Sequence, residues 1–203
     1  MERIARTTSA LPTPEQRLPA SWFQRDVVDV AKDLIGCALV HKKRAGIIVE
    51  TEAYLGSHDL ASHARFGPTS RTSVMFGPGG VSYVYLCYGI HQMFNIVTGI
   101  EGEGQAVLIR AIAPLVGLGD DPKVGQGPGK VTKALGITKA QDRKDLTKGP
   151  LYVAREVSNV VIASGPRVGV DYAGDDWANR PLRFWWKGHP AVSRMPSPKR
   201  ASS

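Results

Sequence analysis

The sequence is poor in cysteine and in long apolar runs, and it has fewer acidic than basic residues. Only Cys37 and Cys87 occur in 203 residues, too few for a disulfide framework or a four-cysteine metal site. No segment approaches the ~20 apolar residues that a transmembrane helix needs. No secretory signal is visible near Met1. These absences argue against an integral membrane protein and a secreted disulfide scaffold, and they predict a cytoplasmic, intracellular location.

The basic excess is the first positive signal. Lys and Arg number 26 against 18 Asp and Glu, which gives a net charge of +8 and an isoelectric point near 9.7. This balance favours a polyanionic partner such as DNA, RNA or an anionic membrane surface, although basic residues can also serve solubility alone. No basic amphipathic helix with an apolar face is visible, so nucleic acid is preferred over a membrane.

The hydrophobic pattern predicts one folded domain at 21–195, between a flexible N-terminal segment at 1–20 and a flexible C-terminal tail at 196–203. Asp26 can cap a helix that ends at Gly36. A hairpin of strands 81–88 and 91–98 is expected around a turn at Gly89, and further strands are expected at 37–41, 47–51, 106–112, 157–163, 167–172 and 182–187. A helix is expected at 130–135. Antiparallel pairings with a few packed helices predict the α+β class.

Three charged residues stand in apolar strand segments. Arg110 lies within the run from Ala106 to Ile112, where a guanidinium needs a partner unless it reaches solvent at a strand end. Glu50 and Glu52 follow an apolar strand and share a face by alternation. They could compete for one arginine, or one could turn to solvent. A structural ion pair and a carboxylate that activates water are both open interpretations.

Two other features carry weaker signals. His58 and His63 are loosely spaced and lack an obvious third metal ligand. A histidine that hydrogen-bonds a substrate or the carboxylate is therefore preferred to metal binding, and a plain surface histidine remains the alternative. Tyr88 stands at the turn of the hairpin, where a bulky side chain can enter a DNA duplex as a wedge.

One stretch imitates a nucleotide-binding motif without meeting its requirements. The segment Gly125-Gln-Gly-Pro-Gly-Lys-Val-Thr132 has the wrong spacing for a P-loop. A helix that begins near Lys130 can still bind a backbone phosphate at its N-terminus. Phe184, Trp185 and Trp186 can stack on bases, but a packed strand is the preferred interpretation.

An ordered series of short motifs runs from about Arg25 to Ser193. Its members are Glu50-Thr-Glu-Ala-Tyr-Leu-Gly56, Ala61-Ser-His63, Met75-Phe-Gly-Pro-Gly79, Tyr83-Val-Tyr85 through Tyr88-Gly89 to Asn95, Val107-Leu-Ile-Arg-Ala111, Gly127-Pro-Gly-Lys130 and Arg167-Val-Gly-Val170. Each motif is weak alone, but together they closely resemble the alkyladenine (3-methyladenine, or methylpurine) DNA glycosylases. The family's fold is a single compact α+β domain with a curved antiparallel sheet and a protruding hairpin.

The resemblance implies a role for each matching residue. Glu52 would be the general base, and Arg110 and the backbone carbonyl of Val168 would help to hold the attacking water. Tyr88 would fill the gap left in the duplex. Base-pocket roles are implied for the sandwiching rings of Tyr54, His63 and Tyr85, for the lining residues Ala61, Leu108 and Gly169, and for Asn95, which stands where the family rejects the exocyclic amine of guanine. Further candidate DNA contacts are Thr69, Arg71, Ile90, His91 and Lys130.

The implied activity is that of a monofunctional DNA glycosylase that starts base excision repair. It would act as a monomer on double-stranded DNA containing alkylated or deaminated purines, without a metal or cofactor, and without lyase activity because no lysine is placed to form a Schiff base. Two rival classes remain: a non-catalytic nucleic-acid-binding module that uses the same basic face and hairpin, and a hydrolase of free nucleosides. Glu52 and Arg110 argue against the first rival, and the hairpin argues against the second.

Overall fold

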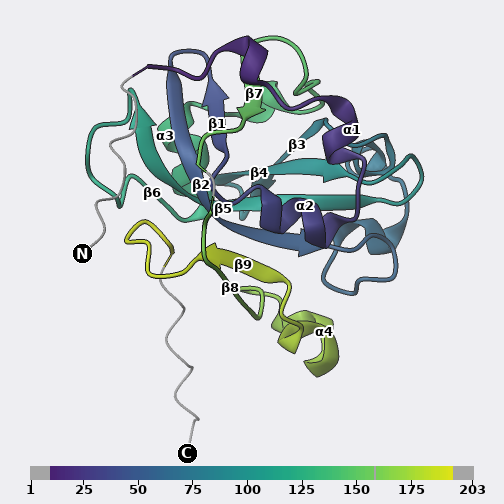
Figure 1. The fold of residues 1–203 in the computed structure, drawn as a ribbon. Coiled ribbons are helices and arrows are strands. Elements are labelled where there is room, and N and C mark those ends of the chain that lie inside the picture. Colours follow the sequence, from purple (N-terminus) through teal and green to yellow (C-terminus); the bar gives the residue numbers. More distant parts are fainter. Residues whose placement is uncertain (1–9, 158, 194–203) are drawn as a thin grey trace, which may run out of the picture.

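Antiparallel strands dominate the computed structural model, which describes residues 10–157 and 159–193. Within these residues nine strands form one curved sheet (Figure 1). Its main path has the order β3 (Ser82–Cys87), β4 (His91–Thr98), β5 (Gln105–Val116), β2 (Arg44–Tyr54), β1 (Ala38–His41) and β7 (Leu151–Ala154). Off this path, β6 (Gly125–Gln126) pairs with β5, and β9 (Arg183–Trp186) pairs with both β2 and β8 (Ile162–Gly165). The antiparallel pairing confirms the α+β prediction.

Helices cover one face of this sheet. α2 (Val27–Asp33) contacts β2 and β5 and lies in front of them in Figure 1. It begins at Asp26, whose side chain accepts hydrogen bonds from two amides of the first turn, as predicted. α3 (Pro128–Leu135) contacts β4 and β5. The shorter helices are α1 (Ala20–Phe23) and α4 (Asp175–Asn179), and single 3₁₀ turns occur at Pro14–Gln16, His63–Phe66, Ser73–Phe76, Lys139–Gln141 and Asp171–Ala173.

The pairing of β2 with β5 is irregular near the middle of both strands. The register of Cα partners passes through Ile48–Ile112, Glu50–Ala111 and Thr51–Ile109. It therefore skips Val49 on β2 and Arg110 on β5. Such bulges bend a strand and reverse the alternation of its side chains.

The reversal decides which face receives the acidic side chains. Strict alternation would place Glu50 and Glu52 on the face of Ile48, inside the apolar core beneath α2. Instead Thr51 faces α2 and donates its hydroxyl to the Ala31 carbonyl at 2.8 Å. Glu50 and Glu52 consequently face the other side of the sheet.

The hairpin of β3 and β4 confirms the sequence prediction. Its strands pair from Ser82–Ile96 to Cys87–His91. The turn contains Tyr88, whose φ of +49° lies in the left-handed region, followed by Gly89 at +72°. A non-glycine residue in this region is uncommon and is strained unless its surroundings hold it.

The predicted flexible segment 1–20 is wrong for the residues that the structure describes. Leu18 is 2% exposed and lies in the main core, and Arg17 forms a bridge with Ala154 and stacks over the Tyr152 ring at 4.5 Å. The edge of the sheet at β7 provides these partners, which the local sequence does not reveal. Residues 1–9 and the tail predicted at 196–203 lie outside the described residues.

Two strand predictions need correction. Residues 167–172 form a loop followed by the 3₁₀ turn Asp171–Ala173, because Gly169 has a φ of +75° and interrupts an extended chain. The strand expected at 157–163 begins only at Ile162. β7 was not predicted, whereas β9 confirms the strand expected at 182–187.

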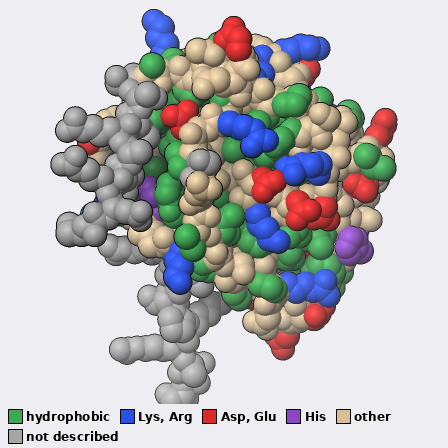
Figure 2. All heavy atoms as spheres, in the orientation of Figure 1, with side chains coloured by type: hydrophobic (Ala, Val, Ile, Leu, Met, Phe, Trp, Pro, Cys, Tyr) green, Lys and Arg blue, Asp and Glu red, His purple; other side chains and the backbone are tan. Residues whose placement is uncertain are grey.

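The surface on the α2 side carries charges of both signs. Figure 2 shows Lys and Arg side chains lying among Asp and Glu on this face. One such pair joins Arg25 to Asp33 at 2.9 Å. The net positive charge is therefore not gathered into a patch on this side. In the described part of the chain, no helix combines the length and apolarity needed to cross a bilayer.

Candidate active site

Glu52 lies at the floor of a cavity of about 510 Å³. The residue is fully buried, and its side chain faces the hollow from near the end of β2. Its Oε1 accepts a hydrogen bond from the Val168 amide at 2.7 Å and forms an ion pair with Arg110 Nη1 at 3.2 Å. Its Oε2 accepts from the Tyr54 hydroxyl at 3.0 Å. Two hydrogen bonds and one ion pair therefore hold one carboxylate in a single orientation at the edge of an open space.

Arg110 joins the two acidic residues of β2. Its Nε donates to Glu50 at 3.0 Å while its Nη1 contacts Glu52. Burial alone lowers the pKa of Arg110, but the neighbouring carboxylates of Glu52 and Glu50 outweigh burial and raise the pKa above its ordinary value. The acids thus do not compete for the arginine, because one guanidinium serves both. Glu50 fits the structural ion-pair interpretation, and Glu52 faces the cavity.

A second buried ion pair holds the loop beside Glu52. Arg167 and Asp59 meet through two hydrogen bonds of 2.5 and 2.9 Å, and both side chains are fully buried. Arg167 also donates to the Ala53 carbonyl at 2.9 Å. The pair therefore anchors the segment that presents the Val168 amide to Glu52. Sequence reasoning missed both residues, although Arg167 stands in a matching motif and Asp59 lies between the two histidines.

The aromatic residues expected around the base form the cavity wall. Tyr54, His63 and Tyr85 all line the large cavity. The His63 and Tyr85 rings contact edge to face, with centroids 4.6 Å apart. Burial, with help from the positive charges of Arg71 and Arg65, lowers the pKa of His63 to about 4. His63 is therefore neutral near pH 7 and can both donate and accept hydrogen bonds.

A smaller cavity of about 40 Å³ continues from the large one. The two cavities share the walls Tyr54, Ser62, His63, Tyr85 and Tyr172. Ala61 and Asn95 line the smaller cavity, and Asn95 is held by a bond from its Nδ2 to the Tyr83 carbonyl at 3.1 Å. Leu108 and Gly169 line the larger one. The structure thus brings all seven expected base-pocket residues to two adjoining hollows.

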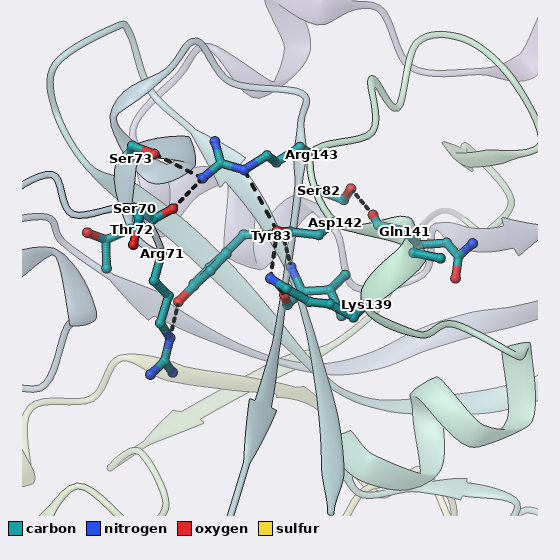
Figure 3. A network of polar contacts seen from close by, with 12 residues as sticks. Ser70, Arg71, Thr72, Ser73, Ser82, Tyr83, Lys139, Gln141, Asp142 and Arg143 are labelled. Carbon is teal, nitrogen blue, oxygen red and sulfur yellow. Dashed lines mark hydrogen bonds and ion pairs between the residues drawn. The ribbon is translucent and has the colours of Figure 1, made fainter. Parts of the chain in front are cut away.

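A polar network beside the cavity wall joins the loop at 70–73 to Tyr83 and to the segment at 139–143, as Figure 3 shows. Arg143 donates to the Ser70 carbonyl at 2.8 Å and to the Ser73 hydroxyl at 2.9 Å, so it ties their loop to the segment after α3. Arg71 donates its Nε to the Tyr83 hydroxyl at 3.2 Å and stacks over Tyr85 at 4.9 Å. The loop is therefore anchored at several points rather than suspended over the cavity.

The candidate DNA contacts are spread around the cavity. Tyr88 and Ile90 are 92% and 73% exposed, and Tyr88 lines the large cavity. His91 lies beside Gly129 at the start of α3, which places the first turn of α3, with Lys130, near the turn end of the hairpin. Thr69 uses its hydroxyl within its own loop, bonding the Thr72 hydroxyl at 2.8 Å. Arg71 contacts the cavity wall, as described above.

The histidine cluster does not have the geometry of a metal centre. His58 packs against the Trp177 ring at 5.8 Å, whereas Nδ1 of His63 bonds the Tyr83 hydroxyl at 3.1 Å. Within residues 10–157 and 159–193, no three His, Cys, Asp or Glu side chains are grouped closely enough to hold an ion. The two histidine side chains therefore contact different parts of the fold.

Comparison with known proteins gives consistent matches over most of the chain. The sequence pattern of a family described as methylpurine-DNA glycosylase (MPG) matches residues 21–190. A protein of Myxococcus xanthus named "Putative 3-methyladenine DNA glycosylase" is 48% identical over 189 residues, covering 90% of this chain and 96% of the relative. Proteins with the same name occur in Methanoculleus marisnigri, at 48% identity over 194 residues (87% and 98% covered), and in Legionella pneumophila strain Corby, at 45% over 185 residues (88% and 99% covered).

Proposed function

Because this chain belongs to the methylpurine-DNA glycosylase family and is a hydrolase of N-glycosyl bonds in DNA, we propose that it excises alkylated or deaminated purines after flipping them out of the duplex. The flipped base would enter the cavity in front of Glu52. The observation that carries this proposal is a buried carboxylate, held by two hydrogen bonds and one ion pair, beside a hollow of about 510 Å³. This volume falls within the range of small-molecule sites, roughly 300–1,000 Å³.

Base flipping is required because the glycosidic carbon cannot be reached inside a stacked duplex. Tyr88 lines the same cavity as Glu52 and projects from the hairpin into solvent. It would occupy the gap left by the extracted nucleotide and prevent its return. Damaged or mispaired purines are easier to unstack, which contributes to selectivity.

The proposed reaction is a single displacement by water. The oxygen of water bonds to the anomeric carbon of the sugar, the bond from that carbon to the purine nitrogen breaks, and its electron pair leaves with the purine. Glu52 takes the proton of the water, and its negative charge also stabilises the positive charge that develops on the sugar. A cationic alkylated purine leaves as a neutral base, whereas a neutral lesion such as hypoxanthine needs an added proton.

The two oxygens of Glu52 are not equivalent in this scheme. Oε1 accepts a hydrogen bond from the Val168 amide and is ion-paired with Arg110, while Oε2 accepts a hydrogen bond from the Tyr54 hydroxyl. Oε1 therefore has two contacts and Oε2 has one, which leaves Oε2 the less occupied of the two oxygens. We therefore assign the proton of the attacking water to Oε2. Arg110 and the Val168 carbonyl would help to hold that water.

The same geometry favours a monofunctional enzyme. A Schiff-base lyase needs an amine at the sugar, and none of the described residues lining either cavity is a lysine. We also propose that the protein acts as a monomer. We expect the protein to act inside the cell on double-stranded DNA.

The direct test is release of purines from duplexes that each carry one alkylated or deaminated base. We expect abasic sites in lesion duplexes and none in undamaged ones. Glu52→Gln should retain affinity for lesion duplex and lose base release by about 10²–10⁴-fold or more. The matched control is Glu101→Gln, which removes an exposed carboxylate.

Three results would contradict the proposal. Near-normal turnover by Glu52→Gln would remove the water-activation role. Binding without release by the wild-type protein would favour a non-catalytic nucleic-acid-binding module. Cleavage of free nucleosides as efficient as cleavage in duplexes would favour a nucleoside hydrolase.

A further inference from the structure

Four charged side chains beneath the cavity floor form one connected cluster. Glu50 and Glu52 are 0% exposed, Arg183 is 1% exposed and Arg110 is 8% exposed. The two carboxylates and two guanidinium groups balance in charge. Such balance is needed because an unpaired buried charge is strongly unfavourable.

Within this cluster, Glu50 does not line either cavity. Its oxygens accept from Arg110 Nε at 3.0 Å, from Arg183 Nε at 2.7 Å, and from the amide and hydroxyl of Ser193 at 2.7 and 2.8 Å. Glu50 is thus held by β5, by β9 and by a segment near the C-terminus. It cannot touch a substrate in the cavity, so any catalytic influence must pass through a neighbour.

That neighbour is Arg110. A guanidinium is planar, and its donors are fixed relative to one another. The hydrogen bond from Nε to Glu50 fixes the orientation of the guanidinium group. This orientation places Nη1 beside Oε1 of Glu52. Without Glu50, the guanidinium could turn and pair with both oxygens of Glu52. It would then occupy the acceptor position on Oε2 that the attacking water needs.

We propose that Glu50, itself held by Arg183 and Ser193, is a positioning residue that restricts Arg110 to one oxygen of Glu52 and keeps the other open for water. The inference rests on the proposed function. It makes the segment that ends at Ser193 part of the support of the active site. Ser193 lies beyond residues 21–190, the part of the chain that the family pattern matches.

The test is Glu50→Gln, which preserves shape and removes charge. At saturating enzyme, the single-turnover rate constant for base release should fall by about 10²-fold, the loss that a small misplacement of catalytic groups can cause. The dissociation constant for lesion duplex should change by less than about threefold, because Glu50 does not face the DNA.

Introducing Glu50→Gln into the Arg110→Lys variant separates a positioning role of Glu50 from a general structural role. Lysine in Arg110→Lys keeps the charge but lacks the Nε that binds Glu50. Adding Glu50→Gln to Arg110→Lys should therefore change the rate constant by less than about threefold. An equal loss in both backgrounds would overturn the inference, as would a Glu50→Gln single variant within about twofold of wild type.

Ser193→Ala provides a milder variant that does not disturb the charge balance. Loss of one hydrogen bond to Glu50 should lower the rate constant by about 2–10-fold. Duplex affinity should be unchanged and the midpoint of thermal unfolding should fall only slightly, because Arg110, Arg183 and the Ser193 amide still bind Glu50. Ser164→Ala, an exposed serine of β8, is the matched control and should behave as wild type. An unaffected Ser193→Ala would count against the role of the C-terminal segment.

The outcomes also separate this inference from the proposed function. A wild-type protein that releases no damaged purine overturns the proposed function. A wild-type protein that releases purines while Glu50→Gln releases them equally well overturns only the positioning role.

Discussion

The floor and the rim of the cavity are built in opposite ways. On the floor, Glu52 and Arg110 are 0% and 8% exposed and stand on the two long strands β2 and β5. On the rim, Tyr88 and Ile90 are 92% and 73% exposed at the tip of a two-stranded hairpin. Rigid, desolvated groups suit proton transfer, whereas projecting side chains suit contact with a large partner.

The difference also appears in what holds each region. Every charged group on the floor contacts at least one oppositely charged group. Removal of one charged side chain therefore leaves a buried partner without its full countercharge. The turn residue Tyr88 is instead in the left-handed backbone region and is mostly surrounded by solvent. Substitution on the floor should therefore affect stability and chemistry together, and substitution on the rim should affect DNA engagement alone.

The largest expected effect is on the floor. Asp59→Asn keeps the shape of the side chain and leaves Arg167 buried without a countercharge, which should lower the free energy of unfolding by about 3–5 kcal/mol. Denaturant titration measures this loss. Asp176→Asn is the control, because its 2.7 Å pair with Arg180 is exposed and should contribute at most about 1 kcal/mol. Equal losses in the two variants would erase the contrast between buried and exposed pairs.

The next effect is on the rim. Tyr88→Ser should weaken formation of the flipped complex by about 5–150-fold, the loss of one stacking contact worth about 1–3 kcal/mol. Its free energy of unfolding should stay within about 0.5 kcal/mol of wild type, since the side chain lies in solvent. A fluorescent base analogue beside the lesion reports flipping, and Ile100→Ser is an exposed control away from the cavity. An equal loss of nonspecific duplex binding would argue against a wedge.

Salt should separate binding from chemistry. The slope of affinity against salt on logarithmic axes is about −0.9 for each phosphate contacted. With three contacts, affinity should fall roughly 40-fold from about 50 to 200 mM salt. The rate constant for base release at saturating enzyme should hardly change, because Glu52 is buried. A flat affinity would show that the positive charge of the protein does not grip the DNA.

The last expected effect appears only at acidic pH and concerns His63, which lines the cavity wall. Its pKa is about 4 in the folded protein, against 6.5 for an ordinary histidine. As the pH falls, the histidine is therefore protonated in the unfolded chain before it is protonated in the folded protein. The contribution of neutral His63 to the free energy of unfolding is fully present above pH 6.5 and is lost as the pH falls toward 4. His63→Gln should lose less stability than wild type over that range. Denaturant titrations at several pH values measure the difference, and parallel losses would contradict it.

Local sequence was sufficient for much of the fold. Asp26 caps α2 as expected, and the apolar runs of β2, β4 and β5 form strands because their alternating and continuous patterns allow little else. The loop at 167–172 was predicted as a strand. Gly169 adopts a positive φ and Arg167 turns inward to Asp59, a partner more than a hundred positions away. Periodicity carries no information about such a partner.

The sequence by itself determined the antiparallel character of the fold, the exposed hairpin tip, and the presence of two carboxylates near one buried arginine. Only the tertiary structure decided that Glu52 faces the cavity while Glu50 is held by Arg183 and Ser193. The reason is physical. The bulges at Val49 and Arg110 reverse the alternation of side chains, and the partners of Glu50 come from segments that meet only after the chain has folded.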